Sequence, residues 1–411
     1  MTIIIIKMGK AFYQLGIIFL YLYFKIAIFF GYQKAIKSEK GRGKWKTKLI
    51  KNLNPNKPNY LLHASSFGEG LMAIPLIEKI IKEKNANIIL TFFSSSGYEN
   101  FNYENSSLVK VYLPLDFKNR IKEFIEIVNP KQMIFVKYDL WMNLIDVCLQ
   151  KKIPISVFSS KFFENHWYFS FYGKWARKRL QKFSNIFTID NSSKVLLESK
   201  GFDNVMLSGD TRFDNVNTEN KKSSLKVNRP CIVIGSSWEK EEELAVNLLK
   251  DFEDISIIIA PHEIDKNRIK NIRKKFGKSC VFYSELKNKD LPKLLIIDKI
   301  GLLADLYSLS DLAIVGGGFS GKLHNILEPA AKGNIIFFGQ HHSKYPEANL
   351  MIESGFAFEI KSYNFLKEKI KQLLIENSFS KYKTKSKDFV NKNKGATKII
   401  YENIFNVGKS L

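Results

Sequence analysis

The amino-acid sequence predicts two doubly wound α/β domains, each built on a mostly parallel sheet. Three observations lead to this fold class. Short apolar runs alternate with helical patterns along residues 59–209, the alternation stops in the polar stretch 215–228, and it restarts at Cys231. Glycine-rich turns directly follow several of the apolar runs. Strands that alternate with helices are typical of βαβ units and therefore of parallel sheets.

The first domain is expected to hold seven short apolar strands, with helical periodicity between most of them. The predicted strands are Tyr60–His63, Ile88–Phe93, Val109–Leu113, Met133–Val136, Ile155–Phe158, Ile186–Ile189 and Val205–Leu207, and the clearest helices are Leu71–Ile81 and Ile121–Val128.

The second domain repeats this alternation after the polar stretch. Its predicted strands are Cys231–Ile234, Ile255–Ile259, Leu294–Ile297, Leu312–Val315 and Ile335–Phe338, and its helices are Lys240–Leu249, Lys266–Phe276 and Tyr345–Glu353. From Tyr363 onward the chain is helical and basic in pattern. We therefore expect a membrane anchor and basic flank (1–35), a first domain (36–215), a linker (216–228), a second domain (229–385) and a C-terminal helix (386–411) that packs back on the first domain.

The N-terminus carries an apolar run, Ala11 to Gly31, interrupted by the polar Gln14 and Lys25. Its length approaches the roughly 20 residues that span a bilayer. A strongly basic flank follows at residues 34–51, which predicts a cytoplasmic location for the flank and the body of the protein, and attraction to anionic lipids. The alternative is a buried core helix followed by a solvated basic linker.

Composition limits the classes of function. The 411 residues have a formal net charge of +24, from 64 Lys and Arg against 40 Asp and Glu, which favours anionic partners. Cys148, Cys231 and Cys280 are far apart and form no C-x-x-C pair, so neither a disulfide framework nor a zinc site is expected. The six histidines show no metal-ligand spacing, so we expect no metal.

A glycine-rich unit at residues 310–339 predicts the main binding site. Gly316, Gly317 and Gly318 follow an apolar strand, and Asn325 and Glu328 are placed on the next predicted helix, where they share one face. Glycines let a phosphate approach backbone N–H groups at a helix N-terminus, and a carboxylate can bind a ribose hydroxyl. The alternative is a turn that merely permits tight packing.

Two loops of the first domain add polar side chains at predicted strand ends, where open α/β sheets bind ligands. Glu69 follows the first strand, either as a general base or as a carboxylate that caps the next helix. Lys137 and Asp139 follow the strand that ends at Val136, with Trp141 as a pocket wall or a core residue.

Further loops place anion-binding groups at other strand ends. Arg212 is an anion-binding candidate, with a surface ion pair to Asp214 as the alternative. A turn made of Gly235, Ser236 and Ser237 offers hydroxyl and N–H groups to a phosphate. The acidic run that follows it is expected to be the solvated first turn of a helix. His262 follows another strand, facing a ligand or serving a structural role.

Taken in order, these motifs resemble those of the transferases that attach 3-deoxy-D-manno-octulosonic acid (Kdo) to the lipid A precursor. Family motifs H-x-x-S-x-G-E, G-N-T-[KR]-F-D, G-S-[TS]-x-x-x-E-E and H-N-x-L-E-P-A-A are similar to residues 63–69, 209–214, 235–242 and 324–331. The chain differs where many members carry E-x-E-[LI]-W-P-N, because it has Lys137 and Asp139 there, and Lys161 stands in place of an Arg.

The resemblance implies an inverting glycosyltransferase of the GT-B fold, with two Rossmann-like domains, on the cytoplasmic face of the inner membrane. It implies CMP-Kdo as donor, lipid IVA as acceptor in lipopolysaccharide biosynthesis, and no metal cofactor. Glu69 would be the catalytic base, Arg212 would stabilise the leaving CMP, and the acceptor and sugar would contact Lys137, Asp139 and Lys161. The donor would bind Gly235, Ser236, Ser237, His262, the three glycines, Asn325 and Glu328.

Two other classes of function are kept open by the sequence. A GT-B enzyme that uses a UDP-sugar and a lipid-linked acceptor would share the glycine-rich fingerprint of the second domain. A non-enzymatic basic protein that binds membrane or nucleic acid would explain the charge, but it would not explain ordered polar loops at strand ends. We therefore expect no nucleic-acid partner.

Overall fold

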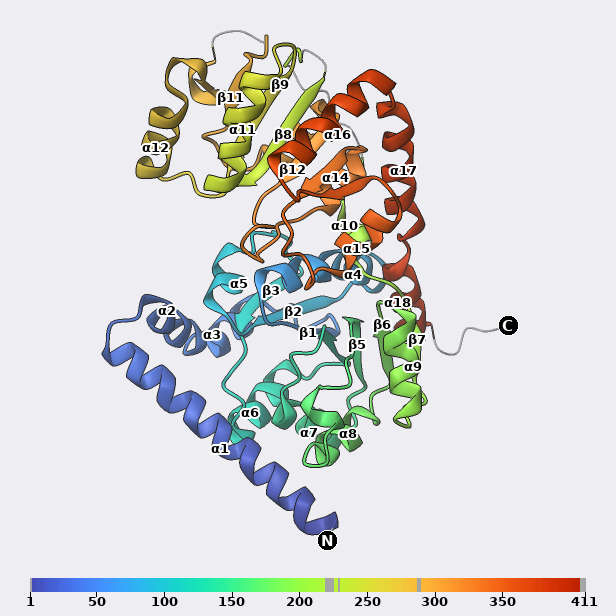
Figure 1. Cartoon of the computed structure of the whole chain (residues 1–411). Coiled ribbons are helices and arrows are strands. Elements are labelled where there is room, and N and C mark those ends of the chain that lie inside the picture. The colour runs from blue at the N-terminus through green and yellow to red at the C-terminus, as the bar shows by residue number, and fades with distance from the viewer. Residues whose placement is uncertain (1, 219–224, 228–229, 287–289, 407–411) are drawn as a thin grey trace. The chain divides into compact units, whose positions relative to one another are not determined.

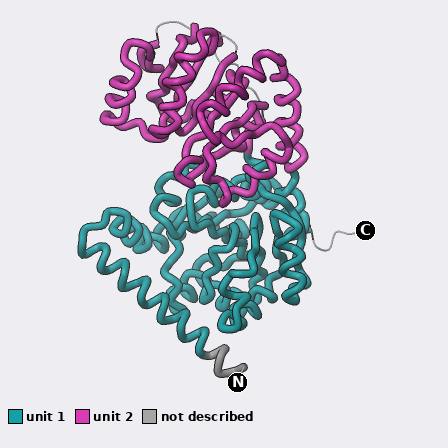
Figure 2. Tube along the Cα trace, in the orientation of Figure 1, with its two compact units in different colours: residues 1–215, 394–411 teal, residues 216–393 magenta. Residues whose placement is uncertain are grey.

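The computed structural model of the chain describes residues 2–218, 225–227, 230–286 and 290–406. It divides into two compact units, one made of Met1–Asn215 with Lys394–Leu411 and the other of Val216–Asn393 (Figure 2). Residues 219–224 and 228 of the predicted linker lie outside the described residues.

Unit 1 is built on a seven-stranded parallel sheet of order β3-β2-β1-β4-β5-β6-β7. Every strand predicted for this domain is present. The strands are β1 (Asn59–Ala64), β2 (Asn87–Phe92), β3 (Leu108–Tyr112), β4 (Gln132–Val136), β5 (Ile155–Ser160), β6 (Asn185–Thr188) and β7 (Val205–Leu207). All residues of β2, β4 and β5 are buried, because helices cover both faces of a doubly wound sheet.

The helices of unit 1 connect these strands and extend the chain at its N-terminus (Figure 1). They are α1 (Thr2–Phe29), α2 (Gln33–Arg42), α3 (Trp45–Asn52), α4 (Phe67–Lys84), α5 (Ser95–Asn100), α6 (Lys118–Val128), α7 (Met142–Gln150), η1 (Trp167–Phe169), α8 (Lys174–Leu180), α9 (Asn191–Ser199) and α10 (Arg212–Asn215). The basic flank is therefore folded into α2 and α3 and is not a linker.

Unit 2 has a second seven-stranded parallel sheet, of order β10-β11-β9-β8-β12-β13-β14. The strands are β8 (Cys231–Ser237), β9 (Ser256–Pro261), β10 (Val281–Phe282), β11 (Leu294–Ile296), β12 (Leu312–Val315), β13 (Ile335–Phe338) and β14 (Ala357–Glu359). The edge strands β10 and β14 were not predicted; β10 has two residues, too few to show a period. With both sheets present, the predicted α/β fold class is confirmed.

The helices of unit 2 are α11 (Glu239–Asp251), α12 (Lys266–Phe276), η2 (Gly277–Ser279), η3 (Tyr283–Glu285), α13 (Leu303–Leu306), η4 (Tyr307–Leu309), α14 (Leu327–Lys332), α15 (Pro346–Glu353), α16 (Tyr363–Glu376) and α17 (Phe379–Lys392). The chain then returns to unit 1, where α18 (Ala396–Phe405) buries Ile400 and Tyr401 in a core shared with α4. Asp214 holds the start of α18 by accepting hydrogen bonds from Gly395 N–H and Thr397 N–H, both at 2.6 Å.

The helix α1 contains a 22-residue segment, Met8–Phe29, that is long and apolar enough to cross a membrane. Few of its residues are buried; Ile17 is one of them. The alternative of a buried core helix is therefore wrong for this segment.

Candidate active site

In unit 1, the order of the strands reverses between β1 and β4, which are neighbours in the sheet. In open α/β sheets, such a switch point opens a crevice at the carboxyl ends of the strands. The loop after β1 carries Glu69, and the loop after β4 carries Lys137 and Asp139. The topology thus brings Glu69 to the same sheet edge as two side chains that follow it by about 70 positions in sequence.

Glu69 lies in the first turn of α4, where Ser66 is the N-cap residue and Glu69 reaches back to the residue before it. Its Oε2 accepts a hydrogen bond of 2.5 Å from Ser65 N–H, while Ser66 Oγ accepts one of 3.4 Å from Glu69 N–H. Burial raises the pKa of Glu69 above its ordinary value, opposed by the Ser65 hydrogen bond and the charge of Lys137. A half-buried carboxylate with a raised pKa suits a general base, so the capping role and the proposed catalytic role are compatible.

Next to Glu69, a hydrogen-bonded network links β1 and β2 to the loop after β4. The buried His63 contacts Thr91 Oγ1 through Nδ1 at 2.9 Å and Asp139 Oδ2 through Nε2 at 3.1 Å. Thr91 donates its own hydrogen to Leu62 O at 3.1 Å, so Nδ1 of His63 must donate to Thr91. Trp141 Nε1 donates to Asp139 Oδ2 at 3.1 Å.

Trp141 Nε1 also donates to His63 Nε2 at 3.2 Å, so the indole N–H lies between His63 and Asp139. Burial works against ionisation of Asp139, but the hydrogen bond and charge of His63 outweigh it and keep the pKa of Asp139 below its ordinary value. Asp139 is thereby fixed in place by His63 and Trp141. Trp141 is partly buried and serves this network from the edge of the core.

The backbone at Lys137 has φ of +59°, which non-glycine residues rarely adopt. Two hydrogen bonds hold it there: Lys137 N–H donates to Phe158 O at 2.8 Å, and Ser160 Oγ donates to Lys137 O at 2.7 Å. Strained backbone conformations that are held by surrounding contacts occur most often at functional sites. Lys161, on the loop after β5, forms an ion pair of 3.2 Å with Asp190.

Arg212 begins α10, after the loop that follows β7. Its guanidinium pairs with Asp210, with Nε–Oδ2 and Nη2–Oδ2 distances of 2.8 and 2.7 Å. The expected alternative, an ion pair with Asp214, is wrong, because Asp214 caps α18 instead.

Unit 2 has its own switch point, between β8 and β12. Gly235, Ser236 and Ser237 end β8, and the three glycines follow β12. The two loops touch: Gly316 N–H donates to Gly235 O at 2.9 Å, and a Cβ on Gly316 would lie 2.0 Å from Ser236 O. Ser236 has φ of +52° at a register shift in the strand. Gly316 is thus required by the close approach of two backbones.

In the acidic run at the start of α11, Glu239 and Glu243 are exposed but Glu241 and Glu242 are buried, so its interpretation as a solvated first turn is wrong for these two. Glu241 Oε1 accepts from Gly317 N–H at 3.1 Å, and Oε2 accepts from Trp238 N–H at 3.0 Å. Glu242 is fully buried and pairs with Arg268 and Lys275 at 2.5 and 3.3 Å. The carboxylate of Glu241 therefore already accepts the hydrogen bond of Gly317 N–H, one of the groups that were expected to bind phosphate.

His262 lies in a stack of aromatic rings at the same sheet edge. Its ring centroid is 4.7 Å from that of Trp238 and 4.3 Å from that of His324. Burial, aided by the neighbouring His262, lowers the pKa of His324 to about 4, so this imidazole is neutral at physiological pH. Sequence reasoning did not single out Trp238 or His324 as site residues; both lie in loops that follow a strand, the position that selected His262.

Asn325 and Glu328 come together, but not as two positions on one helix. Asn325 precedes α14, where its Oδ1 accepts from Leu327 N–H at 3.0 Å. Its Nδ2 donates to Glu328 Oε1, also at 3.0 Å. Burial, the main influence, raises the pKa of Glu328, opposed by Asn325 and Lys332.

A cavity of about 650 Å³ opens within unit 2, between α11, α12 and the glycine loop. It is lined by Trp238, Glu241, Asp265, Arg268, Gly317 and Phe319, among others. Among the described residues, no group of three or more His, Cys, Asp or Glu side chains is placed to hold a metal ion.

Comparisons with known proteins agree with this arrangement. A sequence model described as 3-deoxy-D-manno-octulosonic-acid transferase (kdotransferase) matches residues 41–215. A 3-deoxy-D-manno-octulosonic acid transferase of Aquifex aeolicus is 25% identical over 336 residues, covering 80% of this chain and 89% of its own. A bifunctional glycosyltransferase/methyltransferase of Fusobacterium nucleatum is 28% identical over 303 residues, or 68% of this chain, and the match spans only 47% of that longer protein.

Solved structures establish the fold. A UDP-N-acetylglucosamine 2-epimerase superposes with a TM-score of 0.59 at 14% identity, covering 86% of this chain and 97% of its own. A glycosyltransferase of Rickettsia africae superposes with a TM-score of 0.56 at 15% identity, covering 86% and 100%. At these identities the likeness concerns architecture alone, and the sequence matches carry the assignment. The chain is similar in sequence to the 3-deoxy-D-manno-octulosonic acid (Kdo) transferases over most of its length, which supports a glycosyltransferase that acts on Kdo, and its two parallel sheets give it a GT-B-like architecture.

Proposed function

We propose that this protein transfers Kdo from CMP-Kdo to the lipid A precursor lipid IVA, with inversion at the anomeric carbon and Glu69 as the general base. The observation that carries this proposal is the position of Glu69 at the β1/β4 switch point, with a raised pKa and with Lys137 and Asp139 beside it. A base is most effective when its pKa approaches the operating pH.

The proposed step is a direct displacement. A hydroxyl oxygen of the acceptor attacks the anomeric carbon of Kdo from the face opposite CMP, and Glu69 takes the hydroxyl proton. The new C–O bond forms as the bond between that carbon and the CMP phosphate oxygen breaks, and CMP leaves with the electron pair. The strained backbone at Lys137 fixes a cation near the base, where it holds an anionic group of the acceptor or sugar.

The donor is assigned to unit 2. Asn325 and Glu328 form a hydrogen-bonded pair at the start of α14 that suits the ribose hydroxyls. The turn at Ser236 and the stack of Trp238, His262 and His324 lie at the same sheet edge, where a phosphate and a base fit. Since Glu241 already binds Gly317 N–H, we assign phosphate stabilisation in unit 2 to the Ser236 turn, not to Gly317.

We place the protein on the cytoplasmic face of the inner membrane, with the apolar α1 as its attachment. The exposed lysines of α2 and α3 follow α1 directly and suit anionic lipid headgroups. The predicted partners are thus CMP-Kdo, the lipid A precursor and anionic lipids.

Mass spectrometry of lipid IVA incubated with the protein and CMP-Kdo tests this function. We expect the mass to rise by one or more Kdo units with CMP-Kdo and to stay unchanged with UDP-sugars. Because no metal is proposed in the step, EDTA should leave the rate unchanged. Transfer from a UDP-sugar alone would replace the proposal with the UDP-dependent alternative, and loss of transfer in EDTA would refute its metal-free form.

The pH dependence of kcat/KM is expected to shift in opposite directions when the two charges near Glu69 are removed. The base must be ionised, so activity rises with pH through the pKa of Glu69. Lys137 lowers that pKa and Asp139 raises it. Lys137→Met should therefore move the acid limb of the profile to higher pH, and Asp139→Asn should move it to lower pH. Shifts of the same sign in both variants would show that this limb does not report Glu69.

A further inference from the structure

The helix α1 has an inverted distribution of polar and apolar side chains. In a soluble protein the polar face of a surface helix meets water. In α1, Lys10, Gln14 and Lys25 bond to side chains of unit 1, and the face turned away from the protein is apolar. That outer face exposes Met8, Phe12, Leu15, Ile18, Phe19, Leu22, Tyr23, Ile26 and Phe29.

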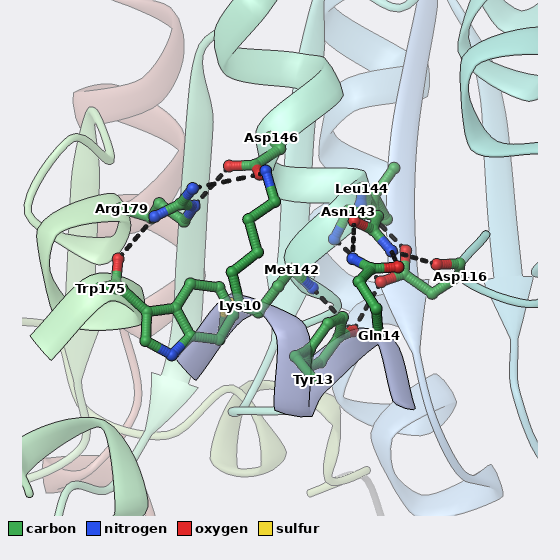
Figure 3. A network of polar contacts seen from close by, with 10 residues as sticks. All are labelled: Lys10, Tyr13, Gln14, Asp116, Met142, Asn143, Leu144, Asp146, Trp175 and Arg179. Carbon is green, nitrogen blue, oxygen red and sulfur yellow. Dashed lines mark hydrogen bonds and ion pairs between the residues drawn. The ribbon is translucent and has the colours of Figure 1, made fainter. Parts of the chain in front are cut away.

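A set of polar contacts, here called the clamp, fixes the first half of α1 to the rest of unit 1 (Figure 3). Tyr13 donates to Asp116 Oδ2 at 2.5 Å, and Gln14 Nε2 donates to Asn143 Oδ1 at 2.7 Å. Asp116 is fully buried and also accepts from Asn143 N–H and Leu144 N–H, at 2.9 and 3.0 Å, where it caps α7. Detaching α1 would leave these buried groups without partners, which is costly.

The second half of α1 is held as well. The rings of Tyr21 and Phe117 pack edge to face at 5.8 Å, and the guanidinium of Arg42 lies 4.8 Å above the ring of Phe24. Lys25 forms an ion pair of 3.2 Å with Glu39. The clamp therefore runs from Lys10 to Lys25, about 22 Å along the helix at 1.5 Å per residue. A spanning helix needs about 20 residues surrounded by lipid, which this fixed contact with a folded domain prevents.

An apolar groove continues the outer face of α1 onto unit 1. It has a volume of about 540 Å³ and lies between α1 and the segment from η1 to α8. Its walls include Met8, Phe12, Trp167, Phe171, Tyr172 and Trp175. Phe171 is 78% exposed, an unusual position for a large apolar ring unless lipid covers it.

We propose that α1 lies in the plane of one membrane leaflet and does not cross it, with its outer face among the acyl chains and the groove filled by an acyl chain of a bilayer phospholipid. This rests on the membrane attachment proposed above. Three features select lipid: the apolar face is continuous from α1 into the groove, Trp and Tyr suit the level of the headgroups, and the exposed Lys34, Lys37 and Lys40 follow at once.

Depth-dependent quenching tests the orientation. The native Cys148, Cys231 and Cys280 are buried, so a fluorophore can be attached to single cysteines introduced by Phe12→Cys, Phe19→Cys, Ile26→Cys and Phe171→Cys. The full-length variants are bound to vesicles of phosphatidylethanolamine and phosphatidylglycerol that carry spin labels at known depths. Val195→Cys is the control, because Val195 is 54% exposed on α9, away from α1 (Figure 1).

We expect equal depth at residues 12, 19 and 26, quenching at residue 171, and none at residue 195. A profile that is deepest at residue 19 and shallow at both flanks would show a spanning helix and overturn the proposal. The proposal would also be overturned if no label on α1 were quenched, or if the labelled positions on α1 were found crosslinked to a second copy of the chain and not in contact with lipid. Quenching on α1 without residue 171 would overturn the groove assignment. Kdo transfer to detergent-dispersed acceptor is measured on every variant, so that loss of membrane contact and loss of the proposed function are distinguished.

Discussion

Glu69→Gln is expected to lower the rate of Kdo transfer by about 10²–10⁴-fold, the usual cost of losing a general base, while CMP-Kdo binding stays unchanged. Glutamine retains an oxygen that can accept the hydrogen bond from Ser65 N–H, so this bond and the start of α4 should persist. What disappears is the capacity to take a proton. The measurement is single-turnover transfer from CMP-Kdo, together with the affinity for CMP-Kdo.

Glu78→Gln is the matched control. Glu78 lies on the same helix, is exposed, and undergoes the same loss of charge at a position without a proposed role. We expect transfer at the wild-type rate in this variant. If Glu69→Gln also retained the wild-type rate while remaining folded, Glu69 would be a capping residue only, and another group would have to take the proton.

Most of the fold was predictable because buried parallel strands are continuous apolar runs. The strand β12 and the helix α12 have the predicted limits, Leu312–Val315 and Lys266–Phe276. The edge strand β10 has two residues and gave no such signal. The helices α2 and α3 were also not predicted, because a run rich in lysine resembles a solvated linker. Its few buried residues, such as Leu49, give too weak an apolar pattern to indicate a helix.

The site was predictable in its positions but not in its bonds. Within each unit the polar loops could be expected to converge, those after β1 and β4 in unit 1 and those after β8 and β12 in unit 2, since carboxyl ends of parallel strands share one edge of a sheet. The pairing of Glu241 with Gly317 could not, because a carboxylate in the first turn of a helix usually faces water. The link between His63 and Asp139 joins residues 76 positions apart, which only the strand order reveals.

The polar residues of α1 show the same limit in another form. Gln14 and Lys25 looked like interruptions of a membrane segment, yet they are among the points that fix α1 to unit 1. A sequence pattern records that a side chain is polar, but not whether its partner is water, lipid headgroup or protein. The apolar residues on the outer face of α1 give the pattern typical of a membrane segment, and the polar residues fix which face of α1 is turned toward unit 1.

Gly316→Ala is expected to reduce CMP binding by about tenfold or more, which corresponds to about 1.4 kcal/mol. The new Cβ would lie 2.0 Å from Ser236 O and 2.8 Å from Ser236 C, both backbone atoms that cannot rotate away. Overpacking of this kind typically costs about 1–3 kcal/mol. The strain is relieved only by separating the loops after β8 and β12, which are the two loops assigned to the nucleotide. Calorimetric titration with CMP measures the loss.

Gly16→Ala is the control for this substitution, because no atom lies within 4 Å of the Cβ that it adds on α1. Its CMP affinity should match that of the wild type, and its thermal stability should not fall. Circular dichroism at low temperature checks that Gly316→Ala remains folded, so that weaker binding reports the displaced loops and not an unfolded unit 2. Wild-type CMP affinity in a folded Gly316→Ala protein would mean that the close contact of the β8 and β12 loops does not shape the nucleotide site, and the donor would then have to bind elsewhere in unit 2.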